Sequence, residues 1–78
     1  MYLSIIKVKP LKDYKLMLTF ENNENRIFDV KPLLNKGVFK ELKDPEVFKT
    51  VHISFDSIKW NNSADLDPEI LHEESILV

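Results

Sequence analysis

The chain has 78 residues, of which 44% are apolar and none is cysteine. This length suits one domain and is too short for two, so residues 1–78 are expected to fold as a single domain. The lack of cysteine excludes disulfides and thiolate metal sites, and the formal net charge of −2 argues against tight binding to nucleic-acid phosphates. A domain this small is only marginally stable by itself, so a homodimer or a small protein partner is a reasonable expectation.

The charge is unevenly distributed along the chain. Residues 1–49 carry ten basic and seven acidic side chains, whereas residues 50–78 carry six acidic side chains and one base, Lys59. The apolar runs are far shorter than the roughly 20 residues of a membrane span, and no secretory signal is recognised. A cytoplasmic protein is therefore expected, and the sequon Asn61-Asn62-Ser63 is attributed to chance.

The N-terminal part has the pattern of three antiparallel strands. Tyr2–Val8 is rich in β-branched and aromatic residues, Lys15–Phe20 alternates, and Asn25–Val30 follows the polar turn Glu21–Glu24. Asparagine tolerates the left-handed backbone of a tight hairpin. In the second strand, Leu16, Leu18 and Phe20 are expected to lie on one face. In the third strand, the side chains expected on one face are Arg26, Phe28 and Val30. These strands predict a meander with one buried face.

Short helical segments are predicted in the middle of the chain. Pro32–Asn35 predicts one helical turn closed by a Gly37 cap, and a second turn follows through Leu42. The sequence Asp44–Glu46 has the pattern of a helix start, with an aspartate cap, a proline in the first helical position and an acid in the first turn. Phe48 is expected to pack inward from this helix.

The last third of the chain predicts a strand pair. Val51–Phe55 alternates, which places Val51, Ile53 and Phe55 on one face. Asp56-Ser57 is the predicted turn, and Ile58–Trp60 is the short return strand.

A C-terminal helix follows this strand pair. Asp67 is the predicted cap and Pro68 the first helical residue, while Leu66 and Leu71 occupy the two positions of a hydrophobic staple. The helix is expected to run to about Glu74. The apolar tail, residues 76–78, is open to three interpretations: core, a strand that pairs across a dimer, or a disordered end. Together these elements predict an α+β fold with a meander of about three strands, short helical turns, a further strand pair and a C-terminal helix.

Three segments in this order resemble a known family. They are YKLMLTFENNENRIFDVKPLL, GVFKELKDPEVFKTV and SIKWNNSADLDPEILHE. They are similar to the bacterial and phage family known as domain of unknown function 2442, over about Val8 to His72. The most specific part is Trp60, followed by Asp65–Pro68 and then Leu71. The chain departs from the family in the hairpin, where many members have glycine and this sequence has Asn22-Asn23-Glu24.

The resemblance implies an α+β fold and no established activity. Some members of the family stand beside a small partner protein, which implies an antitoxin-like role in a two-gene toxin–antitoxin-type pair. Other members carry an appended helix-turn-helix domain, for which this chain has no room.

Asp65 and Asp67 form an Asp-x-Asp pair, a pattern that can hold a hard cation such as magnesium. A phosphate cradle beside them is not expected, because Gly37 is the sole glycine of the chain. Capping explains Asp67 better than metal binding does. Asp65 is less well explained, and acceptance of backbone amide hydrogen bonds in a loop is one interpretation. No metal and no cofactor are therefore expected.

His52 and His72 are the two histidines, and with a carboxylate they would suit zinc. A solvated surface position is the simpler interpretation of both. Ser54 lies two residues from His52 on the same strand face, so the two could resemble a nucleophile beside its base. This spacing is common by chance and does not indicate catalysis. The sequence therefore predicts no catalytic residues and a protein that is not an enzyme.

Trp60 is the sole tryptophan, and it is either a core anchor or the partly exposed centre of an interface. The candidate interaction residues are Trp60, Asn61, Asn62, Asp65 and Asp67. They lead to the hypothesis of a small non-enzymatic interaction module whose acidic C-terminal third suits a basic protein partner. The alternative is a nucleic-acid-associated accessory protein. Its candidate residues are Lys7, Lys9, Lys12, Lys15 and Arg26.

Overall fold

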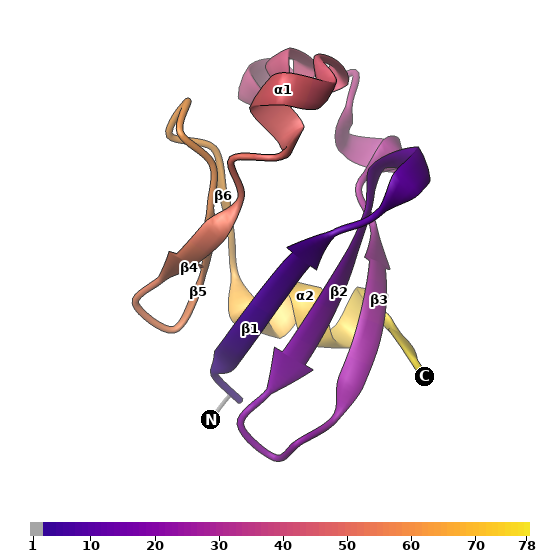
Figure 1. The fold of residues 1–78 in the computed structure, drawn as a ribbon, viewed down its shortest axis with the longest axis vertical. Helices are drawn as coiled ribbons and strands as arrows, with labels where there is room; N and C mark the ends of the chain where they lie inside the picture. Colours follow the sequence, from indigo (N-terminus) through magenta and orange to yellow (C-terminus); the bar gives the residue numbers. More distant parts are fainter. Residues whose placement is uncertain (1–2) are drawn as a thin grey trace.

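Two antiparallel sheets, short helices and several turns form the computed structural model, which describes residues 3–78 (Figure 1). The larger sheet has the order β1 (Ile5–Pro10), β2 (Lys15–Phe20), β3 (Asn25–Asp29) and β7 (Ile76–Leu77). The α+β class and the predicted meander are confirmed. The first strand was predicted from residue 2, which lies outside the described residues, and it extends to residue 10 rather than 8.

The alternation along β2 is the reason why the meander has one buried face. Leu16, Leu18 and Phe20 are fully buried, whereas the residues between them are partly exposed. In the register of the hairpin, Leu16 lies opposite Phe28 and Leu18 opposite Arg26, so these side chains share the inner face. The turn that joins β2 to β3 contains Asn23 with a φ of 69°, a backbone conformation that asparagine tolerates.

The second sheet has the order β4 (His52–Ser54), β5 (Ser57–Lys59) and β6 (Asp65–Leu66). The prediction that Asp56-Ser57 turns the chain is wrong by one residue, because Ser54 pairs with Ser57 and leaves residues 55–56 as the turn. The two-residue strand β6 was not predicted. The strand pair itself is confirmed.

The segment between β3 and β4 winds through 3-10 helices at Lys31–Leu33 and Gly37–Lys43 and then through α1 (Pro45–Phe48). As predicted, the Asp44 carboxylate accepts a hydrogen bond from the Glu46 amide at 3.0 Å. Gly37 is not a cap, because it is the first residue of the second 3-10 helix. Its φ of +46° suits glycine and would strain a residue with a side chain.

The chain ends with α2 (Pro68–Glu74), which runs behind the larger sheet in Figure 1, and with β7. The tail follows none of the three interpretations as stated, because residues 76–77 form a strand that pairs with β3 of the same chain: Ile76 lies opposite Ile27 and Leu77 opposite Arg26. The core interpretation is wrong, because Ile76 is 75% exposed.

One core lies between the two sheets, α1 and α2. The two sheets are also joined by a backbone hydrogen bond from the Ile5 amide to the Asp56 carbonyl, at 3.0 Å. Complete burial of a leucine, isoleucine or phenylalanine contributes about 1.5–3 kcal/mol. The buried apolar residues are Ile5, Leu16, Leu18, Phe20, Phe28, Val30, Leu34, Leu42, Phe48, Val51, Ile58, Trp60, Ala64 and Leu71.

Candidate functional site

Trp60 lies in the core and not on the surface. Its side chain has no exposed area, and its indole Nε1 donates a hydrogen bond to the Phe48 carbonyl at 3.0 Å. The ring also packs edge-on against Phe39, with 6.3 Å between the ring centroids. The interpretation of Trp60 as a partly exposed interface centre is therefore wrong, because no part of its ring is available to a partner.

Asn61 and Asn62 were expected to form a polar rim beside an exposed tryptophan. Asn62 instead fastens the loop to the 3-10 helix at Gly37–Lys43. Its Nδ2 donates to the Glu41 carboxylate at 2.8 Å, and its Oδ1 accepts from the Ala64 amide at 3.1 Å. The Asn61 amide donates to the Thr50 hydroxyl at 3.0 Å, while its side chain is exposed. These contacts explain Asn62 by the geometry of the loop.

The two aspartates of the Asp-x-Asp pair lie on different elements. Asp67 caps α2, because its carboxylate accepts a hydrogen bond from the Glu69 amide at 2.8 Å. Asp65 is the first residue of β6, is exposed, and lies opposite Lys59 of β5. Opposite charges in this cross-strand position attract each other weakly. Nowhere in residues 3–78 do three or more histidine or carboxylate side chains gather closely enough to hold a metal ion.

His52 and Ser54 do not form a nucleophile and base pair. The His52 Nδ1 contacts the Thr50 carbonyl at 2.8 Å. Ser54 lies opposite Ser57 in the β4–β5 register, two pairs away from His52 and Lys59 along the strand. This arrangement leaves the imidazole engaged with backbone, so it does not orient Ser54 for attack.

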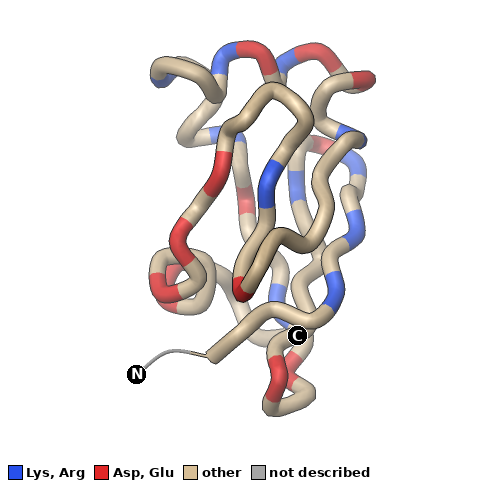
Figure 2. The backbone as a smooth tube through the Cα atoms, turned by 90° about the vertical axis from the view of Figure 1, so that its left-hand side faces the viewer, with Lys and Arg blue, Asp and Glu red and all other residues tan. Residues whose placement is uncertain are grey.

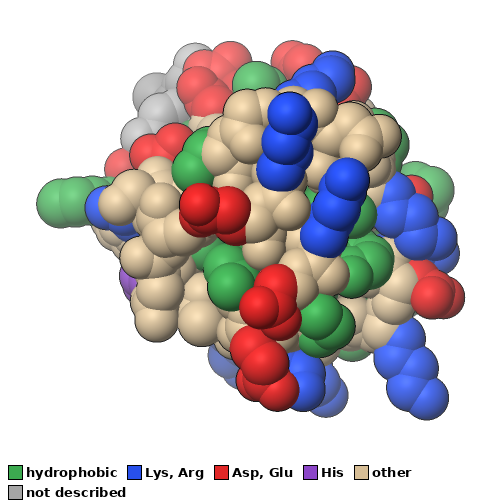
Figure 3. All heavy atoms as spheres, turned by 90° about the horizontal axis from the view of Figure 1, so that it is seen from above, with side chains coloured by type: hydrophobic (Ala, Val, Ile, Leu, Met, Phe, Trp, Pro, Cys, Tyr) green, Lys and Arg blue, Asp and Glu red, His purple; other side chains and the backbone are tan. Residues whose placement is uncertain are grey.

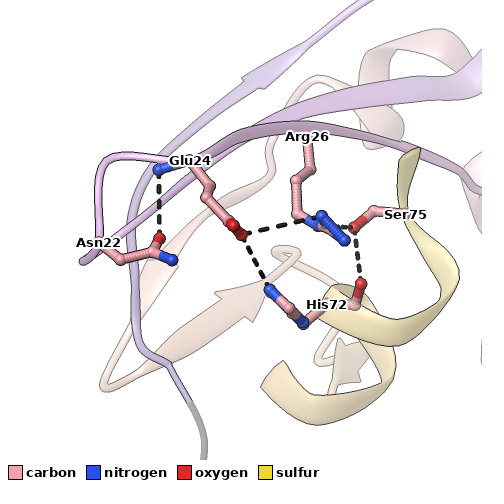
Figure 4. Close-up of polar contacts among 5 residues, drawn as sticks. All are labelled: Asn22, Glu24, Arg26, His72 and Ser75. Atoms are coloured by element: carbon pink, nitrogen blue, oxygen red, sulfur yellow. Dashed lines mark hydrogen bonds and ion pairs between the residues drawn. The ribbon is translucent and has the colours of Figure 1, made fainter. Parts of the chain in front are cut away.

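His72 is half-buried rather than simply solvated. Its ring packs edge-on against Phe20, with 5.0 Å between the centroids, and its Nε2 contacts the Glu24 carboxylate at 3.0 Å. Figure 4 shows this contact as part of a small polar cluster between α2 and the β2–β3 hairpin. In that cluster, Arg26 Nε donates to the Ser75 hydroxyl at 3.1 Å, and this hydroxyl donates to the His72 carbonyl.

The electrostatics of this cluster favour an ionised Glu24. The hydrogen bond from His72 is the main cause that lowers the pKa of the Glu24 carboxyl below its ordinary value, and a smaller desolvation effect opposes it. The hydrogen bond with Asn22 and the charge of Arg26, 3.8 Å away, lower the pKa further. The cluster joins elements 48 residues apart in the chain, so no local sequence signal reveals it. These contacts join α2 and the residue after it to the β2–β3 hairpin.

The most exposed large apolar side chain of the described residues is Phe55, at 98%. The sequence pattern places it in the strand, on one face with Val51 and Ile53, and that prediction is wrong because Phe55 lies in the turn and not in β4. Ile53 is 37% exposed, and Val51 alone of the three is buried. Phe55 also has a φ of 55°, which bulky side chains rarely adopt. The shifted turn is thus what brings an aromatic ring into solvent.

Figure 2 looks onto the β4–β5 hairpin and shows how charge is divided around it. Red segments follow β6 and α2 on the left, and blue segments follow β1 on the right. The acidic residues on the first side include Asp65, Asp67 and Glu69, all exposed. The hairpin with Phe55 therefore stands between an acidic and a basic flank.

The larger sheet has an outer face without a helix over it. The cross-strand partners on this face include Lys7 with Thr19, Lys9 with Met17, and Lys15 with Asp29. Arg26 lies on the opposite face with Ser75, so the predicted basic group is divided between two faces. None of the helices in the described part of the chain has the length and apolar character that a membrane crossing requires.

Comparisons with curated proteins and with solved structures find no match to this chain. A family model matches residues 5–76, which is nearly the whole sequence and includes both sheets, α1 and α2. The predicted resemblance is thereby confirmed: the chain belongs to the family described as Protein of unknown function (DUF2442).

Proposed function

We propose that this chain is a small non-enzymatic protein-interaction module that binds its partner through the tip of the β4–β5 hairpin. The observation that carries the proposal is Phe55, whose ring is 98% exposed at the first position of a two-residue turn. Aromatic side chains are enriched at protein interfaces, where a few buried residues supply most of the binding energy. Ile53, at 37% exposure, extends the apolar surface along β4.

The backbone at Phe55 supports the same conclusion. Two-residue hairpin turns with a positive φ at the first position favour glycine there, because a side chain is strained in that conformation. The ring of Phe55 has no compensating burial, since almost all of it is in solvent. A residue that strains the hairpin and does not fill the core is best explained by a contact outside the chain.

The charge around the hairpin indicates the kind of partner. Residues 50–78 carry a formal charge of −5, and exposed acids follow β6 and α2 beside the hairpin. Complementary charge speeds association and disfavours wrong partners. The partner that fits is a small basic protein with an apolar pocket for one ring. In the cell, such a module would have an antitoxin-like role in a two-gene toxin–antitoxin-type pair.

A pull-down with the protein encoded by the neighbouring gene tests the proposal. Wild type is compared with Phe55→Gly, which removes the ring and suits the backbone, and with Val38→Ser, which changes an apolar residue 44% exposed on a different segment. We expect loss of the partner with Phe55→Gly and full retention with Val38→Ser. Equal retention by both folded variants would overturn the role of the hairpin. Analytical ultracentrifugation of the chain alone measures its oligomeric state and shows whether the partner is a second copy of the chain.

The basic outer face of the sheet favours a second candidate function, a nucleic-acid-associated accessory protein. Lys7 and Lys9 are exposed on edge strand β1, and Lys15 lies on the same face. Fluorescence titration with duplex DNA at two salt concentrations tests it, because binding through phosphates weakens steeply as salt rises. Absence of binding at low salt would rule this function out.

A further inference from the structure

A cavity of about 470 Å³ opens between the β1–β2 connection and α1. Its apolar walls are Pro10, Leu11, Tyr14, Pro45 and Phe48. Small-molecule sites in proteins have volumes of roughly 300–1,000 Å³, mainly apolar walls and a few charged or polar groups, so this cavity has the size and lining of such a site. Phe55 and the other residues of the hairpin turn do not line it.

The connection that forms one wall has an unusual backbone. Asp13 and Tyr14 are consecutive residues with φ values of 61° and 59°. This conformation turns the Tyr14 ring edge-on to Phe48, with 5.3 Å between the centroids, and its hydroxyl donates a hydrogen bond to the Lys43 carbonyl. Strained residues of this kind concentrate at ligand sites, where the surrounding structure holds them in place. The Tyr14 side chain is therefore fixed against α1 and the segment that precedes it.

Charged side chains supply the polar part of the lining. Lys12 comes from the β1–β2 connection and Lys49 from the end of α1, so the two ammonium groups belong to opposite walls. Asp13 is the one acid of the lining, which leaves a net positive charge. Figure 3 looks onto this end of the molecule and shows lysine side chains around exposed apolar surface.

We infer that this cavity binds a small apolar carboxylate, with its ring or alkyl body against Phe48 and Tyr14 and its carboxylate between Lys12 and Lys49. The apolar walls exclude a highly polar ligand such as a nucleotide as the best fit, because most of its groups would lose water without gaining partners. Because the lining carries a net positive charge, a carboxylic acid should bind more tightly than the uncharged amide of the same shape. This site goes beyond the proposed function and depends on different residues.

The chain carries its own reporter for this site. Trp60 is the sole tryptophan, its ring centroid lies 6.4 Å from that of Phe48, and its indole N–H is bonded to the Phe48 carbonyl. A ligand that contacts Phe48 changes the environment of this one indole N–H, which gives a single separate signal in an NMR titration. Amide shifts in an NMR titration then locate the ligand on the connection and on α1.

The experiment compares 2-naphthoate with 2-naphthamide, which share the ring system and differ in charge. We expect saturable binding of the acid, with amide shifts at residues 11–14 and 46–49, and about fivefold weaker binding of the amide. Lys12→Gln with Lys49→Gln removes this preference, whereas Lys31→Gln with Lys36→Gln, a change of equal charge outside the lining, preserves it. Asp13→Asn strengthens binding of the acid, and asparagine suits the positive φ.

Two results would overturn the inference. One is the absence of shifts at the lining residues with either compound while the spectrum remains that of a folded protein. The other is an equal affinity for acid and amide that none of the three variants alters. Phe55 does not line this cavity, so Phe55→Gly should not alter binding of the naphthoate. A cavity that binds no ligand is therefore a separate result from a hairpin that binds no protein.

Discussion

Replacing Phe55 with glycine is expected to stabilise the chain relative to replacing it with alanine. Both substitutions remove a ring that is 98% exposed, so the loss of burial is small and nearly equal in the two variants. They differ in the backbone, because alanine keeps a side chain at a φ of 55° and glycine does not. A left-handed conformation costs an L-residue roughly 1–2 kcal/mol.

Glycine has a cost of its own, because it loses about 0.5–1 kcal/mol more conformational entropy than alanine on folding. The difference leaves Phe55→Gly more stable than Phe55→Ala by about 0.5–1 kcal/mol. In a domain of this size, 1 kcal/mol corresponds to a Tm change of roughly 4–8 °C. The expected gap in Tm between the two variants is therefore about 2–8 °C.

Urea unfolding followed by Trp60 fluorescence and by far-ultraviolet circular dichroism measures this difference, because the buried indole becomes exposed on unfolding. His52 provides the matched control, since it is exposed and lies in β4 with ordinary strand pairing. There, glycine should be less stable than alanine by about 0.5–1 kcal/mol. If glycine at position 55 were also the less stable variant, strain at Phe55 would be refuted, and with it one argument for a binding role.

Substitutions at three further residues test the other contacts. Trp60→Phe leaves the buried Phe48 carbonyl without its indole donor, so circular dichroism in urea should show a loss of about 1–3 kcal/mol plus lost packing. Asp67→Ala removes the cap of α2 and should cost about 1 kcal/mol in the same assay, whereas Asp67→Asn should cost little. Because the pKa of Glu24 is lowered in the folded chain, its contribution is present above the ordinary value of 4.5 and disappears as pH falls through the lowered pKa. Melting at a series of pH values below 5 should therefore show a weaker acid dependence in Glu24→Gln than in wild type, and identical profiles would contradict this linkage.

Local signals in the sequence were sufficient where neighbouring residues decide the structure. The helix start at Asp67-Pro68 is encoded within three residues, and the observed hydrogen bond to the Glu69 amide is the one that the pattern predicts. The inner face of β2 follows directly from its alternation. Both features depend on short-range geometry, which a single sequence contains.

Contacts between distant segments were beyond the reach of the pattern. The pairing of β7 with β3 depends on where α2 delivers the chain, and no residue near Ile76 specifies it. The turn was predicted at Asp56-Ser57, one residue too late, because aspartate and serine favour turns and phenylalanine does not. The error of one residue assigned Phe55 to the strand, on one face with Val51 and Ile53, whereas Phe55 lies in the turn and is exposed.

Two of the positions where the local rules fail are those on which the two proposals depend. The non-glycine residues with positive φ in the described part of the chain are Asp13, Tyr14, Asn23, Phe55 and Ser63. Two of them are aromatic, Tyr14 and Phe55, and their surroundings differ. The Tyr14 ring gains a contact with Phe48 and a hydrogen bond within the fold, which offset its strain. Phe55 gains neither a ring contact nor burial inside the chain, so its compensation is expected from a partner.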